Sequence, residues 1–95
     1  MKNYEVMFIV KANLEESAIK EVSKGYENLL KTLKAELVNS KDLGQKKLAY
    51  PINKEVRGYY YLMNIKANND AIKEFDRKMR LDENILRHLI IKEEE

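Results

Sequence analysis

Residues 43–62 read LGQKKLAYPINKEVRGYYYL, and this stretch joins two predicted strands through one turn. The first strand is predicted over residues 35–52, with a bulge or bend at Gly44. Because Pro51 has no N–H group to donate to a ladder, this segment belongs at a sheet edge or in the loop that follows. We expect the Tyr-Pro pair to end the strand, and residues 53–58 to form a polar turn.

The second strand is predicted over residues 59–66, where alternate side chains belong to opposite faces. One face carries Tyr59, Tyr61, Met63 and Ile65, and the other carries Tyr60, Leu62 and Asn64. Residues 4–10 alternate in the same way and are largely apolar on both faces, which is typical of a central strand. Residues 85–91 are predicted as the last strand, after a turn at residues 81–84.

Two helices are predicted between these strands. Asn13 and Glu16 have the spacing of a capping box, so the first helix is expected to open at Asn13. The second helix is expected to begin within residues 68–70. Each has apolar positions at steps of three and four, which predicts one stripe packed against a sheet. These positions are Ile19, Val22, Tyr26, Leu29, Leu30 and Leu33 in the first helix and Ile72, Phe75 and Met79 in the second.

This order of elements predicts an α+β protein with the ferredoxin-like β-α-β-β-α-β fold. Its four-stranded antiparallel sheet has both helices on one face, which leaves the other face open. A monomer rarely exposes a large apolar patch, so the open face is a candidate partner-protein interface. The alternative is that edges, loops and long side chains screen it. The candidate interface residues are Met7, Ile9, Tyr60, Leu62, Leu89 and Ile91.

Length and composition limit the class of protein. A chain of 95 residues can form one core, so residues 1–95 are predicted as a single domain with a short acidic tail at residues 92–95. Hydrophobic content of 44% against 36% charged residues indicates a folded chain. The absence of cysteine excludes disulfides, thiol nucleophiles and thiolate metal sites. No stretch approaches the roughly 20 apolar residues of a membrane span, so we expect a cytoplasmic protein without a membrane partner.

Residues suited to catalysis or metal binding are few. A lone histidine in an apolar strand, such as His88, is more often a packed or surface side chain than a ligand or a base. The glycines do not form a phosphate-binding loop. The sequence therefore predicts no enzymatic activity, no cofactor, no metal site and no small-molecule substrate. The enzyme alternative, an acyl-phosphate hydrolase that uses Arg57 and Asn64, lacks a loop to cradle the anion.

The net charge of +2 conceals two basic clusters, because residues 41–57 and residues 77–92 each sum to +3. Cations of the first cluster suit phosphate contacts, and a nearby tyrosine could stack on an unpaired base. The alternative is a solvated edge whose lysines discourage strand pairing, with the tyrosines packed around the sheet. We favour RNA contact for Lys46 and Lys47. The other candidates are Lys54 and Arg57, with Tyr50, Tyr59 or Tyr60 as the stacking ring, whereas Arg80, Arg87 and Lys92 fit solvated surface equally well.

Four segments resemble one known family. They are YEVMFIV at residues 4–10, LGQKKLAYPINK at residues 43–54, RGYYYLMNI at residues 57–65 and ILRHLIIK at residues 85–92. The family is that of bacterial small ribosomal subunit protein six, and the resemblance covers residues 2–92. It implies the ferredoxin-like fold, no enzymatic activity, and binding to the central domain of small-subunit ribosomal RNA together with small ribosomal subunit protein eighteen. A net charge of +2 fits shared binding, since it is a weak basis for holding RNA alone.

The resemblance also implies RNA-contact residues. Lys46 and Lys47 match the basic pair of the family, and Tyr50 with Pro51 matches its Tyr-Pro. Asn3 departs from the family, in which this position often carries a basic residue or histidine. The full predicted RNA-binding set is Lys2, Lys46, Lys47, Tyr50, Lys54, Arg57, Arg80, Arg87 and Lys92. The prediction is a structural ribosomal protein of the cytoplasm, and the alternative is a homodimeric ferredoxin-like interaction or regulatory module without RNA binding.

Overall fold

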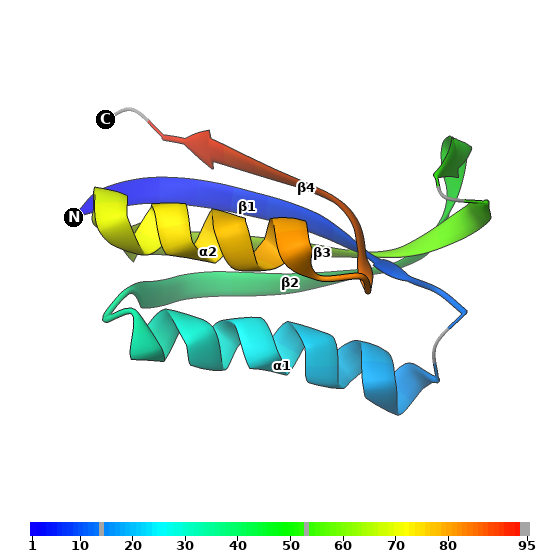
Figure 1. Ribbon diagram of the computed structural model, residues 1–95, viewed down its shortest axis with the longest axis horizontal. Helices are drawn as coiled ribbons and strands as arrows, with labels where there is room; N and C mark the ends of the chain where they lie inside the picture. The colour runs from blue at the N-terminus through cyan, green and yellow to red at the C-terminus, as the bar shows by residue number, and fades with distance from the viewer. Residues whose placement is uncertain (14, 53, 94–95) are drawn as a thin grey trace.

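Figure 1 shows the computed structural model, which describes residues 1–13, 15–52 and 54–93. Within these residues the elements follow the predicted order: β1 (Lys2–Lys11), α1 (Glu16–Thr32), β2 (Glu36–Ile52), β3 (Glu55–Ala67), α2 (Asn69–Leu81) and β4 (Ile85–Lys92). The strands form an antiparallel sheet in the order β2-β3-β1-β4. This arrangement confirms the ferredoxin-like fold class and the central position of the first strand.

The main core lies between the sheet and the two helices. Every second side chain of β1 enters it, and Val6, Phe8 and Val10 are fully buried. From α2 it receives Phe75 and Met79, which are one helical turn apart. Because both helices bury their apolar stripes against the same face of the sheet, the opposite face is left without a helix (Figure 1).

The helix starts follow their sequence signals unevenly. The α2 helix begins as predicted, and Oδ1 of Asn68 accepts a hydrogen bond of 2.8 Å from the N–H of Ala71. The capping box predicted at Asn13 is wrong, because α1 begins only at Glu16 and its N-terminal cap, Glu15, makes no side-chain hydrogen bond. Asn13 instead lies in the turn by which the chain leaves β1.

The hairpin between β2 and β3 is longer than predicted. Residues 53–58 are predicted as a polar turn, but β3 begins at Glu55, which pairs with Ile52. Lys54 has a φ of 68°, the left-handed conformation found in tight turns, and residue 53 lies outside the described residues. The prediction fails because polar residues also suit a strand that projects beyond the core and has solvent on both faces.

The pairing of β2 with β3 has three irregularities, and after a register shift between Leu37 and Asn39 the next is the bulge predicted at Gly44. The register against β3 shifts between Asp42 and Gly44, and Gly44 has a φ of 82°, which glycine adopts without strain. Oδ1 of Asp42 accepts a hydrogen bond of 2.9 Å from the Gly44 N–H, and its Oδ2 accepts one of 2.9 Å from the hydroxyl of Tyr59. Asp42 therefore fixes the bulge to the neighbouring strand.

The third irregularity is an arch formed by residues 48–51. Lys47 and Ile52 are both paired with β3, but between these two pairs β3 has only Val56. Pro51 lies in the arch, where its missing N–H interrupts no ladder, and β2 is an edge strand as predicted. The prediction that the Tyr-Pro pair ends the strand is wrong, because pairing resumes at Ile52.

The C-terminal strand remains bonded slightly beyond its last residue. β4 ends at Lys92, and the N–H of Glu93 donates a hydrogen bond of 2.8 Å to the carbonyl of Asn3. Oε1 of Glu93 accepts a second one, of 3.0 Å, from the side-chain amide of Asn64. The last residues of the predicted acidic tail, 94–95, lie outside the described residues.

Candidate nucleic-acid interface

The end of β2 and the start of β3 form what we term the basic hairpin (residues 46–52 and 54–57). Figure 1 shows it beyond the helices, at one end of the sheet. It carries one carboxylate, Glu55, against four exposed cations. These cations are Lys46, Lys47, Lys54 and Arg57. Positive charge is therefore concentrated on a projecting part of the chain.

Lys47 and Arg57 lie directly opposite each other on the two strands of this hairpin. Like charges in such a position repel and destabilise the pairing. Neither makes an ion pair with any residue that the structure describes. Lys46 belongs to the other face, where its Nζ atom lies 5.7 Å from the centre of the Tyr60 ring. Both faces of the hairpin thus present cations to an external anion.

A second, smaller core lies on the open face of the sheet, beneath the arch. Leu48 is 6% exposed and packs with Ile9 and Leu86. Leu86 reaches this face because the register of β4 against β1 shifts between Ile9 and Val10. Ile9 therefore lies on the predicted open face, but it is 7% exposed and offers a partner little surface of its own.

Arg87 of β4 contacts Tyr50 of the arch. Its Nη1 atom donates a hydrogen bond to the Tyr50 hydroxyl, and its guanidinium carbon lies 5.4 Å from the centre of the ring. Since β2 and β4 are opposite edges of the sheet, this contact spans the open face. Two of the predicted RNA-binding residues are thus engaged with each other.

The remaining predicted RNA-binding residues lie apart from the basic hairpin. Lys2 and Lys92 lie toward the other end of the sheet, about 30 Å and about 23 Å away along β1. Figure 1 shows the start of β1 and the end of β4 at that end. Arg80 lies in the last turn of α2, where its Nη1 atom is 3.7 Å from Oδ2 of Asp76. The structure therefore brings together six of the nine predicted residues, which are Lys46, Lys47, Tyr50, Lys54, Arg57 and Arg87.

Beyond the small core, the open face carries partly exposed apolar side chains among polar ones such as Glu5 and Asn64. Leu89 is 51% exposed and Ile91 is 49% exposed, whereas Met7, Tyr60 and Leu62 are half-buried. A pocket of about 240 Å³ on this face is lined by Met7, Ile9, Arg87, His88 and Leu89. The predicted interface residues therefore share one face, although Ile9 lies beneath Leu48 and Leu86.

Known proteins share both the sequence features and the architecture of this chain. The sequence model of a family described as Ribosomal protein S6 matches residues 3–92. The chain belongs to the ribosomal protein S6 family. The crystal structure of 30S ribosomal protein S6 from Thermotoga maritima has the same fold, with a TM-score of 0.92 at 22% sequence identity over 97% of this chain and 87% of that chain. The resemblance seen in the sequence is confirmed, and the chain is a protein of the small ribosomal subunit.

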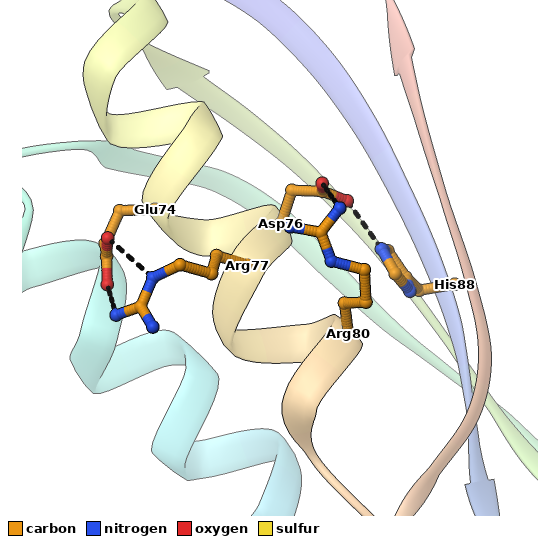
Figure 2. Close-up of polar contacts among 5 residues, drawn as sticks. All are labelled: Glu74, Asp76, Arg77, Arg80 and His88. Carbon is orange, nitrogen blue, oxygen red and sulfur yellow. Dashed lines mark hydrogen bonds and ion pairs between the residues drawn. The ribbon is translucent and has the colours of Figure 1, made fainter.

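Several ionisable side chains of this S6-family chain join its elements. Nε2 of His88 lies 2.6 Å from Oδ1 of Asp76 (Figure 2), and the histidine side chain is 17% exposed. Tyr26 donates a hydrogen bond of 2.6 Å to Asp82, and burial, aided by this bond, raises the pKa of its hydroxyl far above the ordinary value. Over the described ranges, His, Asp and Glu side chains form no group of three that could hold a metal ion. None of the helices described is long and apolar enough to cross a membrane.

One feature of the S6-family site has no signal in the sequence, and another has a partial one. The contact between Tyr50 and Arg87 joins residues 37 positions apart, and periodicity does not predict such pairs. The arch has a partial signal, because Pro51 cannot pair and a bulge is one way to place it within a strand. Pro51 therefore indicates a sheet edge, but the sequence does not predict the arch.

Proposed function

We propose that this chain is a structural, non-enzymatic component of the small ribosomal subunit that binds the central domain of small-subunit ribosomal RNA through its basic hairpin. It binds together with small ribosomal subunit protein eighteen, which packs on the open face of the sheet, and it works in the cytoplasm. Membership of the ribosomal protein S6 family supports this proposal, and so do the charge and exposure of the two surfaces.

The pairing of Lys47 with Arg57 is the observation that best supports the proposed RNA contact. Repulsion between the two cations disfavours the hairpin unless an anion lies nearby. A phosphate group between them would accept hydrogen bonds from both side chains and replace repulsion with attraction. Lys54 at the tip and Lys46 on the other face add cations to the same hairpin. The hairpin therefore suits a run of RNA phosphates rather than one isolated anion.

A protein partner is supported by the charge of the chain and by its open face. A net charge of +2 gives only weak attraction to RNA. Leu89 and Ile91 are about half exposed, and Leu89 lies opposite Met7 on β1. A partner that covers these side chains would remove apolar surface from water. A basic partner would also bring further positive charge close to Arg87, at the margin of the basic hairpin.

Fluorescence anisotropy tests the proposal. A labelled central-domain fragment of small-subunit ribosomal RNA is titrated with the protein at two salt concentrations, with and without small ribosomal subunit protein eighteen. We expect tight binding with the partner, and four hairpin cations predict a slope of log K against log salt of about −3 to −4. Affinity that does not depend on salt, or the absence of binding under both conditions, would contradict the RNA contact.

The exposed apolar face also favours a second candidate, a homodimeric interaction or regulatory module that does not bind RNA. Two copies of the chain could bury Leu89 and Ile91 against each other through a symmetric contact. Light scattering at several protein concentrations separates the candidates. A mass that stays monomeric contradicts the homodimer, whereas a stable dimer that does not bind the RNA fragment favours it.

A further inference from the structure

We propose that Tyr50 and Arg87 form a latch across the open face, which holds the basic hairpin where Lys46 and Lys47 reach RNA. Tyr50 is then a positioning residue, and its ring does not stack on a base. The part of this inference that concerns RNA rests on the proposed function. The part that concerns the hairpin rests on contacts within the chain alone.

The arch (residues 48–51) has little support from the backbone. It belongs to an edge strand, and β3 has only Val56 opposite its four residues. Pro51 has no N–H to donate. Lys47 and Arg57, which are paired just before the arch, repel each other. Side chains must therefore hold the arch against the sheet.

Two side chains of the arch reach the open face, because residues two apart point to the same side. Leu48 enters the small core with Ile9 and Leu86. Tyr50 extends further and contacts Arg87. Arg87 belongs to β4, where it is paired with Ile9 of β1. The arch is thereby attached at the middle of the sheet and again at its far edge. The lysine pair comes immediately before the arch, so its position depends on both attachments.

The latch depends on the chemistry of both partners. The guanidinium of Arg87 is planar, and it donates a hydrogen bond to the hydroxyl while it remains within reach of the ring. Arg87→Lys keeps the charge, but a compact ammonium on a flexible stem is less suited to making both contacts at once. Tyr50→Phe keeps the ring and loses the hydroxyl that accepts the bond. Each conservative change should therefore remove part of the latch.

Hydrogen exchange of the free protein tests whether the latch holds the hairpin. Tyr50→Ala and Arg87→Ala should each speed exchange of the amides in the basic hairpin about tenfold and leave those of β1 unchanged. Tyr50→Phe and Arg87→Lys should give intermediate rates. Arg77→Ala is the matched control, since it removes the same charge from a largely exposed position on α2. Unchanged hairpin exchange in both alanine variants would overturn the latch.

RNA affinity with the partner protein present tests the positioning role. A latch predicts that Tyr50→Ala, Arg87→Ala and the double variant all weaken binding by the same factor, about tenfold, because the second change removes nothing further. If the two residues instead contacted RNA independently, the loss of affinity in the double variant would be the product of the two single losses. The swapped variant, Tyr50→Arg with Arg87→Tyr, keeps the composition and net charge and rebuilds the pair in reverse. It should recover most of the affinity.

The outcomes separate the latch from the proposed function. Losses that multiply, or a swapped variant that binds as weakly as the alanine variants, would overturn the positioning role. If the wild-type protein does not bind the RNA fragment, the proposed function fails. Hydrogen exchange of the free protein would in that event still decide whether Tyr50 and Arg87 hold the hairpin.

Discussion

The Nε2 atom of His88 lies 2.6 Å from the Oδ1 atom of Asp76, and this contact joins the edge strand β4 to the helix α2 (Figure 2). The other oxygen of the same carboxylate lies 3.7 Å from Nη1 of Arg80. The side chains of His88 and Asp76 are 17% and 40% exposed. A partly buried contact of this kind contributes more to stability than an ion pair at the surface.

Asp76→Ala is expected to lower the free energy of unfolding by about 1 to 2 kcal/mol, because it leaves a ring nitrogen of His88 without its partner. Glu74→Ala is the matched control. It removes a carboxylate from the same helix, and its ion pair with Arg77 (Figure 2) includes no side chain as buried as His88, so its effect should be smaller. Urea unfolding measures both variants. Equal losses would show that the contact with His88 adds nothing.

Alkaline pH should weaken the fold through Tyr61. Its side chain is 5% exposed, and burial, followed by the negative charge of Asp42, raises the pKa of its hydroxyl from 10.0 to about 12. Below a pH of about 10 the hydroxyl is protonated in both states, so its contribution to stability is fully present. As the pH rises toward about 12, the unfolded chain ionises first, and the free energy of unfolding falls.

Tyr61→Phe isolates this titration, because it keeps the ring that stacks on Phe8 at 5.4 Å. Between pH values of about 7 and 9 the two proteins should differ by a constant free energy of unfolding. Near pH 12 the variant should gain about 1 to 2 kcal/mol relative to the wild-type protein. Urea unfolding across this range measures the difference. A difference that stays constant to pH 12 would contradict the role of Tyr61.

The order of elements was predictable because it depends on the period of buried side chains. Val6, Phe8 and Val10 alternate along a strand, and Phe75 and Met79 recur at a helical step. The predictions that failed concern segments without such a period. The start of α1 lacks the expected cap, and the hairpin strands continue through polar residues because they project beyond the main core.

The candidate site was predictable only where single residues determine it. The lysine pair and Pro51 indicate a basic edge, since charge and a missing N–H are properties of individual residues. Lys2 is far from the hairpin because β1 starts at the opposite end of the sheet and only its last residues approach the hairpin. The contact of Tyr50 with Arg87 depends on two bulges in different strands, each of which changes the register locally. Local sequence patterns therefore do not predict which side chains two such register shifts bring into contact.

Gly25 and Gly58 should respond to alanine with opposite signs. A Cβ atom at Gly25 would meet nothing within 4 Å, so Gly25→Ala should raise the free energy of unfolding by about 0.5 to 1 kcal/mol. A Cβ atom at Gly58 would lie 2.2 Å from Cγ2 of Ile9, which is packed beneath the arch. Gly58→Ala should therefore lower it by about 1 to 3 kcal/mol. Thermal unfolding compares the two variants. If Gly58→Ala leaves the stability unchanged, the side chains of the small core can shift to accept the added Cβ atom without strain.

Lys46→Glu combined with Lys47→Glu should weaken RNA assembly and leave the thermal midpoint nearly unchanged. Both side chains are exposed, and the attraction that Lys47→Glu creates opposite Arg57 is offset by the loss of the Lys46 contact with the Tyr60 ring. Each reversal replaces a cation that suits a phosphate contact with an anion that repels it. Anisotropy with the ribosomal RNA fragment and a thermal melt of the same sample provide the two readouts. Unaltered assembly would move the RNA surface away from this hairpin.

Lys47→Glu alone should change stability and RNA affinity in opposite directions. A carboxylate opposite Arg57 turns a repulsive cross-strand pair into an attractive one, which should raise the free energy of unfolding by about 0.2 to 1 kcal/mol. RNA affinity should fall, and the salt slope should become shallower by about one. Lys41→Glu, the same reversal on β2 opposite Leu62, is the control for stability and should leave the free energy of unfolding unchanged. A Lys47→Glu protein that is more stable but binds RNA as tightly as before would mean that the like-charge pair does not serve RNA contact.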